Sequence, residues 1–276
     1  MNEQVKPSES QRLSHKQLQL ARKKKYVQKK LFILLTFAFT FGFAAGIFVG
    51  SRKETKINFV MPEIVPLDQT AETTAPVDKN KLPENLPWYL TLVNFEYELP
   101  EDFAPETLAL ADNGYEADSR ICEAVKKMIA DARKEKVGII AVSAFRDYAY
   151  QKELYENKVQ RLQRENGYSV DKARVEAATV VAYPGTSEHQ LGLALDLVDA
   201  RHVKLDTSQE NTAAYKWLYE HCAEYGFIVR YPNGKTEITG IIYEPWHFRY
   251  VGVDAAKVIM ENDITLEEYL LNYYEP

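Results

Sequence analysis

Two short segments of the sequence gather histidine and acidic residues in patterns that suit metal chemistry. The first, YPGTSEHQLGLALD (residues 183–196), predicts a glycine-bearing loop that runs into a strand, with His189 at the entry and Asp196 inside the strand. A carboxylate is unfavourable in a strand that is otherwise apolar, because burying it without a partner is costly. A cation beside Asp196 would remove that cost.

The second segment, YEPWHFRY, carries Glu244 and His247. Pro245 excludes a helix interior, so this segment is predicted to be extended or turning. Together with His189 and Asp196, His247 completes a set of two imidazoles and one carboxylate, which is typical of a zinc site whose fourth position is open to water. A free carboxylate nearby, such as Glu244, could take a proton from that water.

Each of these residues also has a plainer interpretation when it is taken alone. Asp196 could cap a turn, and buried histidines usually have structural hydrogen-bond partners. The occurrence of both histidines and the aspartate in two dense polar segments favours the metal site.

Three segments of the sequence match the motifs of a known family. They are SAFRDYAYQ (residues 143–151), SEHQLGLALD (187–196) and EPWHFRY (244–250), in family order and spacing. On these motifs the sequence resembles the VanY-like D-alanyl-D-alanine carboxypeptidases, zinc peptidases of the bacterial cell wall that are related to the VanX dipeptidases and, more distantly, to the hedgehog zinc domain. The resemblance covers about residues 86–276, and one departure is Ala144, which stands where many members have glycine.

The resemblance implies a complete metallopeptidase site. One Zn²⁺ ion would be held by His189, Asp196 and His247, and Glu244 would act as the general base. The implied fold is α+β, with a central, largely antiparallel sheet and flanking helices. The implied partners are peptidoglycan stem peptides, from which the enzyme would hydrolyse the terminal D-alanine.

The resemblance also places Arg146 and Gln151 in the wall of the substrate pocket and Ser187 beside the metal. Arg146 suits recognition of a free terminal carboxylate, because its planar guanidinium can bond both oxygens at once. A surface ion pair with Asp147 or Glu153 is the alternative role for this arginine.

Three other functions fit parts of the same pattern. An L,D-carboxypeptidase that removes D-alanine from tetrapeptide stems would share these motifs. A non-catalytic cell-wall-binding module would be expected to have lost a metal ligand or the base, and all four are present. A membrane sensor would work through residues 1–30, which are too short for a folded domain and are more simply a topology signal that also attracts lipid headgroups.

The surrounding sequence predicts the elements that must position these residues. Strands separated by helices of uneven length indicate an α+β fold and not a regular parallel α/β fold. Asp118 is the predicted N-cap of a helix whose apolar stripe is Ile121, Val125, Met128, Ile129 and Ala132. Helices are also predicted at 148–164, 171–182 and 213–225, strands at 137–143, 193–198, 227–231 and 240–243, and a capping box at Thr265 and Glu268.

The two cysteines, Cys122 and Cys222, each lie in a predicted helix. An extracytoplasmic location would permit a disulfide between them. Lone cysteines on helices are more often small buried hydrophobes. The sequence leaves both alternatives.

Charge divides the chain of 276 residues into a basic head, an apolar segment and an acidic body. Residues 1–30 hold nine Lys and Arg against two acidic residues, residues 31–50 carry no charge, and residues 51–276 hold 25 Lys and Arg against 38 Asp and Glu. An acidic body of this kind argues against a nucleic-acid-binding protein, which needs a basic face to meet phosphates.

The uncharged segment 31–50 predicts a transmembrane helix, because its twenty residues would rise about 30 Å. The preceding lysines predict a single-pass protein of the cytoplasmic membrane with its N-terminus inside and its catalytic domain outside. A cleaved signal peptide is the alternative, but the apolar run is long for one and a poor cleavage site follows it. The predicted parts are a cytoplasmic head (1–30), the anchor (31–50), a proline-containing tether (51–85) and one zinc carboxypeptidase domain (86–276); no pattern predicts an oligomeric state.

Overall fold

The computed structural model describes residues 82–83 and 85–275. The predicted head, the predicted anchor and almost all of the predicted tether lie outside these residues, so those predictions stay predictions. Among the residues that the structure describes, none of the helices combines the length and the apolar character needed to cross a membrane.

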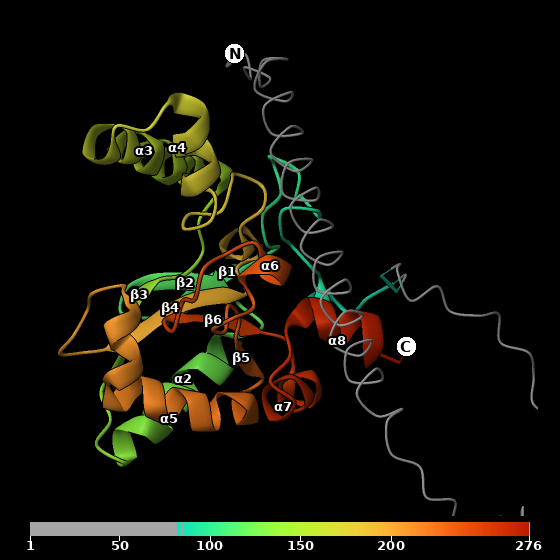
Figure 1. The fold of residues 1–276 in the computed structure, drawn as a ribbon. Helices are drawn as coiled ribbons and strands as arrows, with labels where there is room; N and C mark the ends of the chain where they lie inside the picture. The colour runs from blue at the N-terminus through green and yellow to red at the C-terminus, as the bar shows by residue number, and fades with distance from the viewer. Residues whose placement is uncertain (1–81, 84, 276) are drawn as a thin grey trace, which may run out of the picture. The chain divides into compact units, whose positions relative to one another are not determined.

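An antiparallel sheet lies at the centre of the domain (Figure 1). Its strand order is β3-β4-β6-β5, and all three pairings between neighbouring strands are antiparallel. A separate antiparallel hairpin is formed by β1 (Leu108–Asp112) and β2 (Tyr115–Asp118). The predicted α+β class with a largely antiparallel sheet is therefore confirmed. The sheet strands are β3 (Ile139–Ser143), β4 (Ala194–Asp199), β5 (Phe227–Val229) and β6 (His247–Tyr250).

Helices cover the two faces of the sheet in different ways (Figure 1). One face is covered by α2 (Cys122–Lys134) and α5 (Ala213–His221). On the other side, α3 (Tyr148–Asn166) and α4 (Val170–Ala177) form a helical hairpin that projects from the body. The remaining helices are α6 (Thr236–Thr239), α7 (Val253–Glu261) and α8 (Leu266–Asn272), with short 3₁₀ helices at η2 (Trp88–Leu90), η3 (Glu188–Leu191), η4 (Thr207–Asn211) and η5 (Cys222–Tyr225).

The alternation of side chains along β4 separates the core from the polar site. Leu195 and Leu197 are buried in the main hydrophobic cluster beside side chains of α2 and α5. Because successive strand residues point to opposite faces, Asp196 is directed to the other face, away from this cluster. The predicted apolar stripe of α2 is confirmed, since Val125, Met128 and their partners in the stripe are all buried.

Helix α3 has a capping residue at each end that the sequence makes recognisable. The Asp147 side chain accepts a hydrogen bond from the backbone N–H of Tyr150 at 2.7 Å, which satisfies a free donor of the first turn. Gly167 ends the helix in the left-handed region, with φ 64°. At α8 the predicted capping box of Thr265 and Glu268 is confirmed.

Two element predictions were wrong, and a third element is shorter than predicted. Asp118 does not cap α2; it ends β2, and its carboxylate accepts hydrogen bonds from the side chain and backbone of Arg120. Residues 240–243 are not a strand as predicted, because Gly240 caps α6 in the left-handed region and the chain then runs irregularly toward the site. The predicted helix at 171–182 is also shorter, since α4 ends at Ala177.

The two cysteines are buried and unpaired, which decides between the two alternatives. The Cys122 thiol lies 3.3 Å from the carbonyl oxygen of Ala109 and serves as a weak donor to it. Cys222 lies at the junction of α5 and η5 and belongs to the main hydrophobic cluster.

Candidate metal centre and active-site cleft

Strand pairing brings Asp196 and His247 together. Asp196 on β4 is the register partner of His247 on β6. Directly opposed residues on neighbouring antiparallel strands have Cβ atoms about 4.5–5.5 Å apart, on the same face of the sheet. The two predicted segments therefore meet at one point although fifty residues separate them in the chain.

His189 reaches the same point from the short helix η3, which immediately precedes β4. Its Nδ1 donates a hydrogen bond to the carbonyl oxygen of Ala144 at 2.6 Å, so its Nε2 is left as an acceptor. Gly192 ends η3 with φ 69°, and a Cβ there would lie 2.9 Å from the backbone nitrogen of Asp118. Only glycine fits this turn, which directs the chain from His189 into β4.

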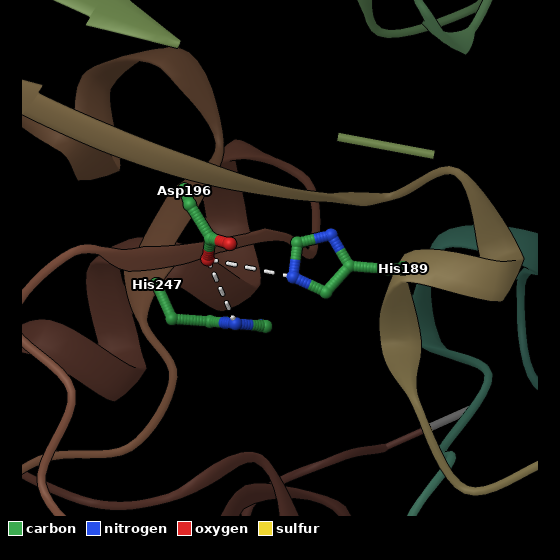
Figure 2. A group of neighbouring side chains, drawn as sticks. All are labelled: His189, Asp196 and His247. Atoms are coloured by element: carbon green, nitrogen blue, oxygen red, sulfur yellow. Dashed lines mark ion pairs between the residues drawn. The ribbon is translucent and has the colours of Figure 1, made fainter. Parts of the chain in front are cut away.

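The three side chains form a buried cluster, which we call the metal triad (Figure 2). Asp196 Oδ1 lies 3.4 Å from His189 Nε2 and 3.4 Å from His247 Nδ1. The ligand atoms of all three residues lie within 4.8 Å of one another. His189 Nε2 and Asp196 Oδ1 are buried and have no hydrogen-bond partner, so a cation among these atoms would satisfy them. Two imidazole nitrogens and one carboxylate oxygen are a donor set that zinc prefers.

The charge states of Asp196 and His189 suit a metal ion, whereas Asp196 and Glu188 outweigh burial and raise the pKa of His247 to about 9, so a metal would have to displace its proton. Burial raises the pKa of Asp196, but His189, His247 and Arg146 outweigh burial and hold that pKa well below its usual range. Burial and the charge of Arg146 lower the pKa of His189 to about 4. A carboxylate anion and a neutral imidazole are the forms that bind metals.

Glu244 is beside the triad but is not one of its converging ligands. Its Oε2 lies 3.7 Å from His247 Nδ1. Burial raises the pKa of Glu244 to about 8, with a further rise from the charge of Asp196. A cation held by the triad would lower this pKa, because a nearby positive charge favours the carboxylate. The pKa of Glu244 therefore depends on whether the triad holds a cation.

Arg146 lies on the other side of Asp196. One guanidinium nitrogen, Nη2, lies 3.3 Å from Asp196 Oδ2, and the other, Nη1, donates to Gln151 Oε1 at 3.0 Å. Gln151 is held in turn by a hydrogen bond from its Nε2 to the carbonyl oxygen of Ala182 at 2.7 Å. The alternative of a surface ion pair with Asp147 or Glu153 is wrong, since the Arg146 side chain is mostly buried and pairs with Asp196.

Ala144, the departure from the family motif, contributes to both the core and the site. The Ala144 side chain is buried in the main hydrophobic cluster, while its carbonyl oxygen holds His189. The backbone N–H of Arg146 donates to the carbonyl oxygen of His189 at 3.2 Å, which ties the first and second motifs together.

The triad lies in the wall of a cleft of about 960 Å³. Ser187, Gln151 and Glu244 line this cleft, as do Arg146 and the triad itself. All seven residues predicted for the site therefore lie in one cavity. The cleft extends from them along α3 and past residues 180–182 and 241–243.

Sequence reasoning missed Glu188, whose carboxylate lies next to His247 of the metal triad. This carboxylate is fully buried, and its Oε2 lies 3.7 Å from His247 Nε2. Its Oε1 accepts hydrogen bonds from Arg230 and Arg249, each at 2.7 Å. Burial raises the pKa of Glu188, but the two arginines outweigh burial and hold it far below its usual range. The signal in the sequence was an acidic residue inside the SEHQ motif with no assigned role.

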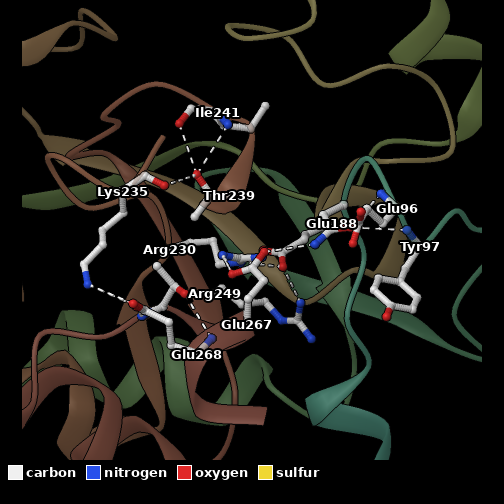
Figure 3. A network of polar contacts seen from close by, with 12 residues as sticks. Glu96, Tyr97, Glu188, Arg230, Lys235, Thr239, Ile241, Arg249, Glu267 and Glu268 are labelled. Carbon is white, nitrogen blue, oxygen red and sulfur yellow. Dashed lines mark hydrogen bonds and ion pairs between the residues drawn. The ribbon is translucent and has the colours of Figure 1, made fainter. Parts of the chain in front are cut away.

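Glu188 belongs to a buried ion-pair network of four residues, Glu188, Arg230, Arg249 and Glu267 (Figure 3). Arg230 binds Glu267 through two hydrogen bonds of 2.9 and 2.7 Å. Arg249 also donates to the backbone carbonyl oxygens of residues 89, 91 and 250. Two positive and two negative groups thus balance inside the domain, next to the triad.

Comparisons with known proteins agree with this geometry. A family model described as "VanY: D-alanyl-D-alanine carboxypeptidase" matches residues 115–253. A D-alanyl-D-alanine carboxypeptidase of Enterococcus faecalis (strain ATCC 700802 / V583) is 43% identical over 184 residues, which make up 66% of this chain and 66% of that protein. The chain thus spans about two thirds of the length of this relative.

Two solved structures are similar over the same region. A mutant of the vancomycin resistance D,D-pentapeptidase VanY from a VanB-type resistance cassette, in complex with Zn(II), is 40% identical with a TM-score of 0.60, over 67% of this chain and 99% of that one. The LdcB LD-carboxypeptidase is 40% identical with a TM-score of 0.58, over 64% of this chain and 83% of that one.

Proposed function

Because the chain belongs to the VanY family of D-alanyl-D-alanine carboxypeptidases, we propose that it is a zinc-dependent peptidase that hydrolyses the terminal D-alanine from peptidoglycan stem peptides. One observation carries the proposal. The donor atoms of His189, Asp196 and His247 converge within 4.8 Å in the wall of an open cleft, and two of these atoms are buried without a partner.

The triad would hold one zinc ion through His189 Nε2, Asp196 Oδ1 and His247 Nδ1. When bound, zinc supplies a Lewis acid that polarises the scissile carbonyl and makes water acidic near neutral pH. The chain supplies the orientation of the ligands. Ala144 fixes the ring of His189, and Glu188 faces the outer nitrogen of His247.

Glu244 would move the proton during hydrolysis. Its carboxylate takes one proton from the attacking water, while the hydroxide oxygen forms the new bond to the carbonyl carbon. When the peptide C–N bond breaks, Glu244 gives that proton to the leaving amine of D-alanine. Its position beside His247, outside the converging ligand atoms, supports this role.

Arg146 and Gln151 would bind the free carboxylate of the terminal D-alanine. The guanidinium lies between Asp196 and Gln151 at the start of the cleft, and its Nε is buried without a hydrogen-bond partner. A substrate carboxylate would accept from this guanidinium, and Ser187 would line the same part of the cleft.

The test compares pentapeptide stems that end in a free carboxylate with stems that end in an amide. We expect the zinc-loaded protein to release D-alanine from the free stem and to act poorly on the amide, with chelator abolishing both activities. Arg146→Ala should lose about 2–4 kcal/mol of transition-state stabilisation on the free stem only. Equal cleavage of free and amidated stems by the wild type would rule out a carboxylate clamp and favour an endopeptidase.

A second candidate is an L,D-carboxypeptidase that acts on tetrapeptide stems. The similarity to LdcB, at 40% identity, is as strong as the similarity to the VanY D,D-pentapeptidase. The mass of the product from matched penta- and tetrapeptide stems separates the two specificities.

The uncharged segment 31–50 supports a further part of the proposal, that the enzyme is anchored in the cytoplasmic membrane with its catalytic domain outside. Peptidoglycan lies on that side, so the anchor would keep the domain near newly made stems. Carbonate extraction of membranes followed by protease treatment of intact spheroplasts would test both the anchoring and the orientation.

A further inference from the structure

The cleft continues well beyond the metal triad along one face of α3. The lining side chains from this helix include Gln151, Leu154, Lys158, Arg161 and Arg164, which are three or four residues apart, the spacing of a single helix face. They run from Gln151, beside Arg146, through Lys158 and Arg161 to Arg164. At 1.5 Å per residue, Lys158 lies about 10 Å and Arg164 about 20 Å along the helix from Gln151.

Three of these lining residues, Lys158, Arg161 and Arg164, form what we call the cationic strip. Residues 51–276 hold 25 Lys and Arg against 38 Asp and Glu, so a run of three cations on one cleft wall goes against the composition of the domain. The strip is therefore a local exception to the acidic composition of the domain.

No acidic side chain of the cleft lining, within the residues that the structure describes, is available to neutralise the strip. Asp196 and Glu244 belong to the metal centre at the other end of the cleft. Asp206 also lines the cleft, but its carboxylate is paired with Lys204 Nζ at 2.6 Å.

The strip residues themselves have few partners. Arg161 lies 4.0 Å from Glu165 on the same helix, and both side chains are about half exposed, so this pair is weak. In residues 82–83 and 85–275, Lys158 and Arg164 form no ion pair. Burial and the charge of Arg161 lower the pKa of Lys158, and the opposing charge of Glu165 does not outweigh them.

We propose that the cationic strip binds a carboxylate in the upstream part of the stem peptide, about three residues before the terminal D-alanine. This inference rests on the proposed function. An extended peptide advances about 3.3–3.6 Å per residue, so a chain that starts at Arg146 would reach Lys158 after about three residues. The γ-linked D-glutamate of a stem lies at that position and leaves its α-carboxylate free.

The test uses two pentapeptides, L-Ala-γ-D-Glu-L-Lys-D-Ala-D-Ala with the α-carboxyl of the glutamate either free or amidated. The enzymes are the zinc-loaded full-length protein, a triple variant with Lys158→Gln, Arg161→Gln and Arg164→Gln, and the control Lys152→Gln. Glutamine is a good helix former, so the variants should keep α3 intact. Lys152 is exposed on the same helix and does not line the cleft.

We expect the wild type to favour the free carboxyl by about tenfold in kcat/KM, mainly through KM, since partly exposed charge pairs are each weak. The triple variant should lose this preference and keep its rate on the amidated stem. The Lys152→Gln control should keep the preference. High salt should weaken the preference in the wild type, because it screens exposed charges.

Equal activity of the wild type on both pentapeptides would overturn the inference, as would a triple variant that loses the same factor on both. A third substrate, acetyl-L-Lys-D-Ala-D-Ala, ends before the strip and separates this result from the proposed function. Cleavage of that short peptide without any carboxyl preference on the long ones refutes only the strip. Failure to cleave all three substrates refutes the proposed function itself.

Discussion

The metal triad and the ion-pair network are both buried, both charged and both built partly on β6, yet their polar atoms are satisfied in different ways. In the network, each guanidinium nitrogen of Arg230 donates to a carboxylate. In the triad, His189 Nε2 and Asp196 Oδ1 are buried without a hydrogen-bond partner. The arginines and Glu267 are therefore satisfied within the network, and its unpaired atom is Glu188 Oε2, which faces His247, whereas the triad needs a ligand from outside.

This difference separates structural charge from functional charge. A buried ion pair is costly to break because the remaining partner is left uncompensated, so the network is a feature of stability. An unpaired buried polar atom costs free energy in the folded state, and it is retained where a bound group offsets that cost. Glu188 belongs to both clusters, since its Oε1 faces the arginines and its Oε2 faces His247.

The largest expected effect is loss of the metal. His189→Ala should reduce bound zinc and hydrolysis to background, because a ligand is removed and the two that remain hold zinc weakly. Zinc should also no longer raise the unfolding temperature, since a metal stabilises only the state that binds it. Metal analysis and thermal unfolding with and without zinc measure both, and His221→Ala serves as the control. Full zinc occupancy in His189→Ala would show that the triad is not the metal site.

Removing an arginine of the network should lower the free energy of unfolding without removing the metal ligands. Arg230→Met should lower the free energy of unfolding by about 3–5 kcal/mol, because Glu267 loses its guanidinium partner while buried and Glu188 keeps only Arg249. The matched control is Arg201→Met, because the Arg201 side chain is 84% exposed and its ion pair with Asp199 should contribute no more than about 1 kcal/mol. Urea unfolding of the metal-free protein gives both values. Similar losses in the two variants would mean that the network is not a special stabilising feature.

Within the site, a substitution of Glu244 tests whether this carboxylate transfers protons or binds the metal. Glu244→Gln should keep zinc and lose at least about 10²-fold in kcat, the usual contribution of a general base. Zinc content and stem hydrolysis are measured on the same sample. A parallel fall of zinc and activity would instead make Glu244 a ligand.

The smallest expected effect concerns the residue that both clusters share. Glu188→Gln should weaken zinc binding by about 10–100-fold, because partners that orient a metal-ligating histidine typically contribute this much. Glu267→Gln is the control, since it changes the same network without touching His247. Chelator competition gives the zinc affinity of each variant. If both variants lost the same affinity, general destabilisation would explain the result.

The site was more predictable from the sequence than the fold around it. His189, Asp196 and His247 lie in short motifs whose residue types are costly to bury without a shared ligand. The hairpin of β1 and β2 was not predicted, although Asn113 and Gly114, with φ values of 48° and 82°, form the turn expected from an Asn-Gly pair. The strands on either side of this turn are short, so the local turn signal alone does not predict the hairpin.

Other features could not be read from local patterns at all. Glu188 and Arg230 are 42 residues apart, and Arg230 lies in a segment that looks like an ordinary strand. No local pattern near either residue predicts the pair, because their contact depends on how β5, β6 and η3 meet in space. Asp118 shows the opposite problem, since a good capping residue was used for a local ion pair with Arg120.

The unpaired thiols have a consequence for how this domain can be produced and where it can survive. Burial raises the pKa of Cys222 to about 12 and also raises that of Cys122, so neither offers a reactive thiolate at neutral pH. Within the part of the chain that the structure describes, no covalent cross-link holds the fold together. Folding therefore requires no oxidant, and the same domain should mature equally well in a reducing expression host and in an environment whose redox potential fluctuates.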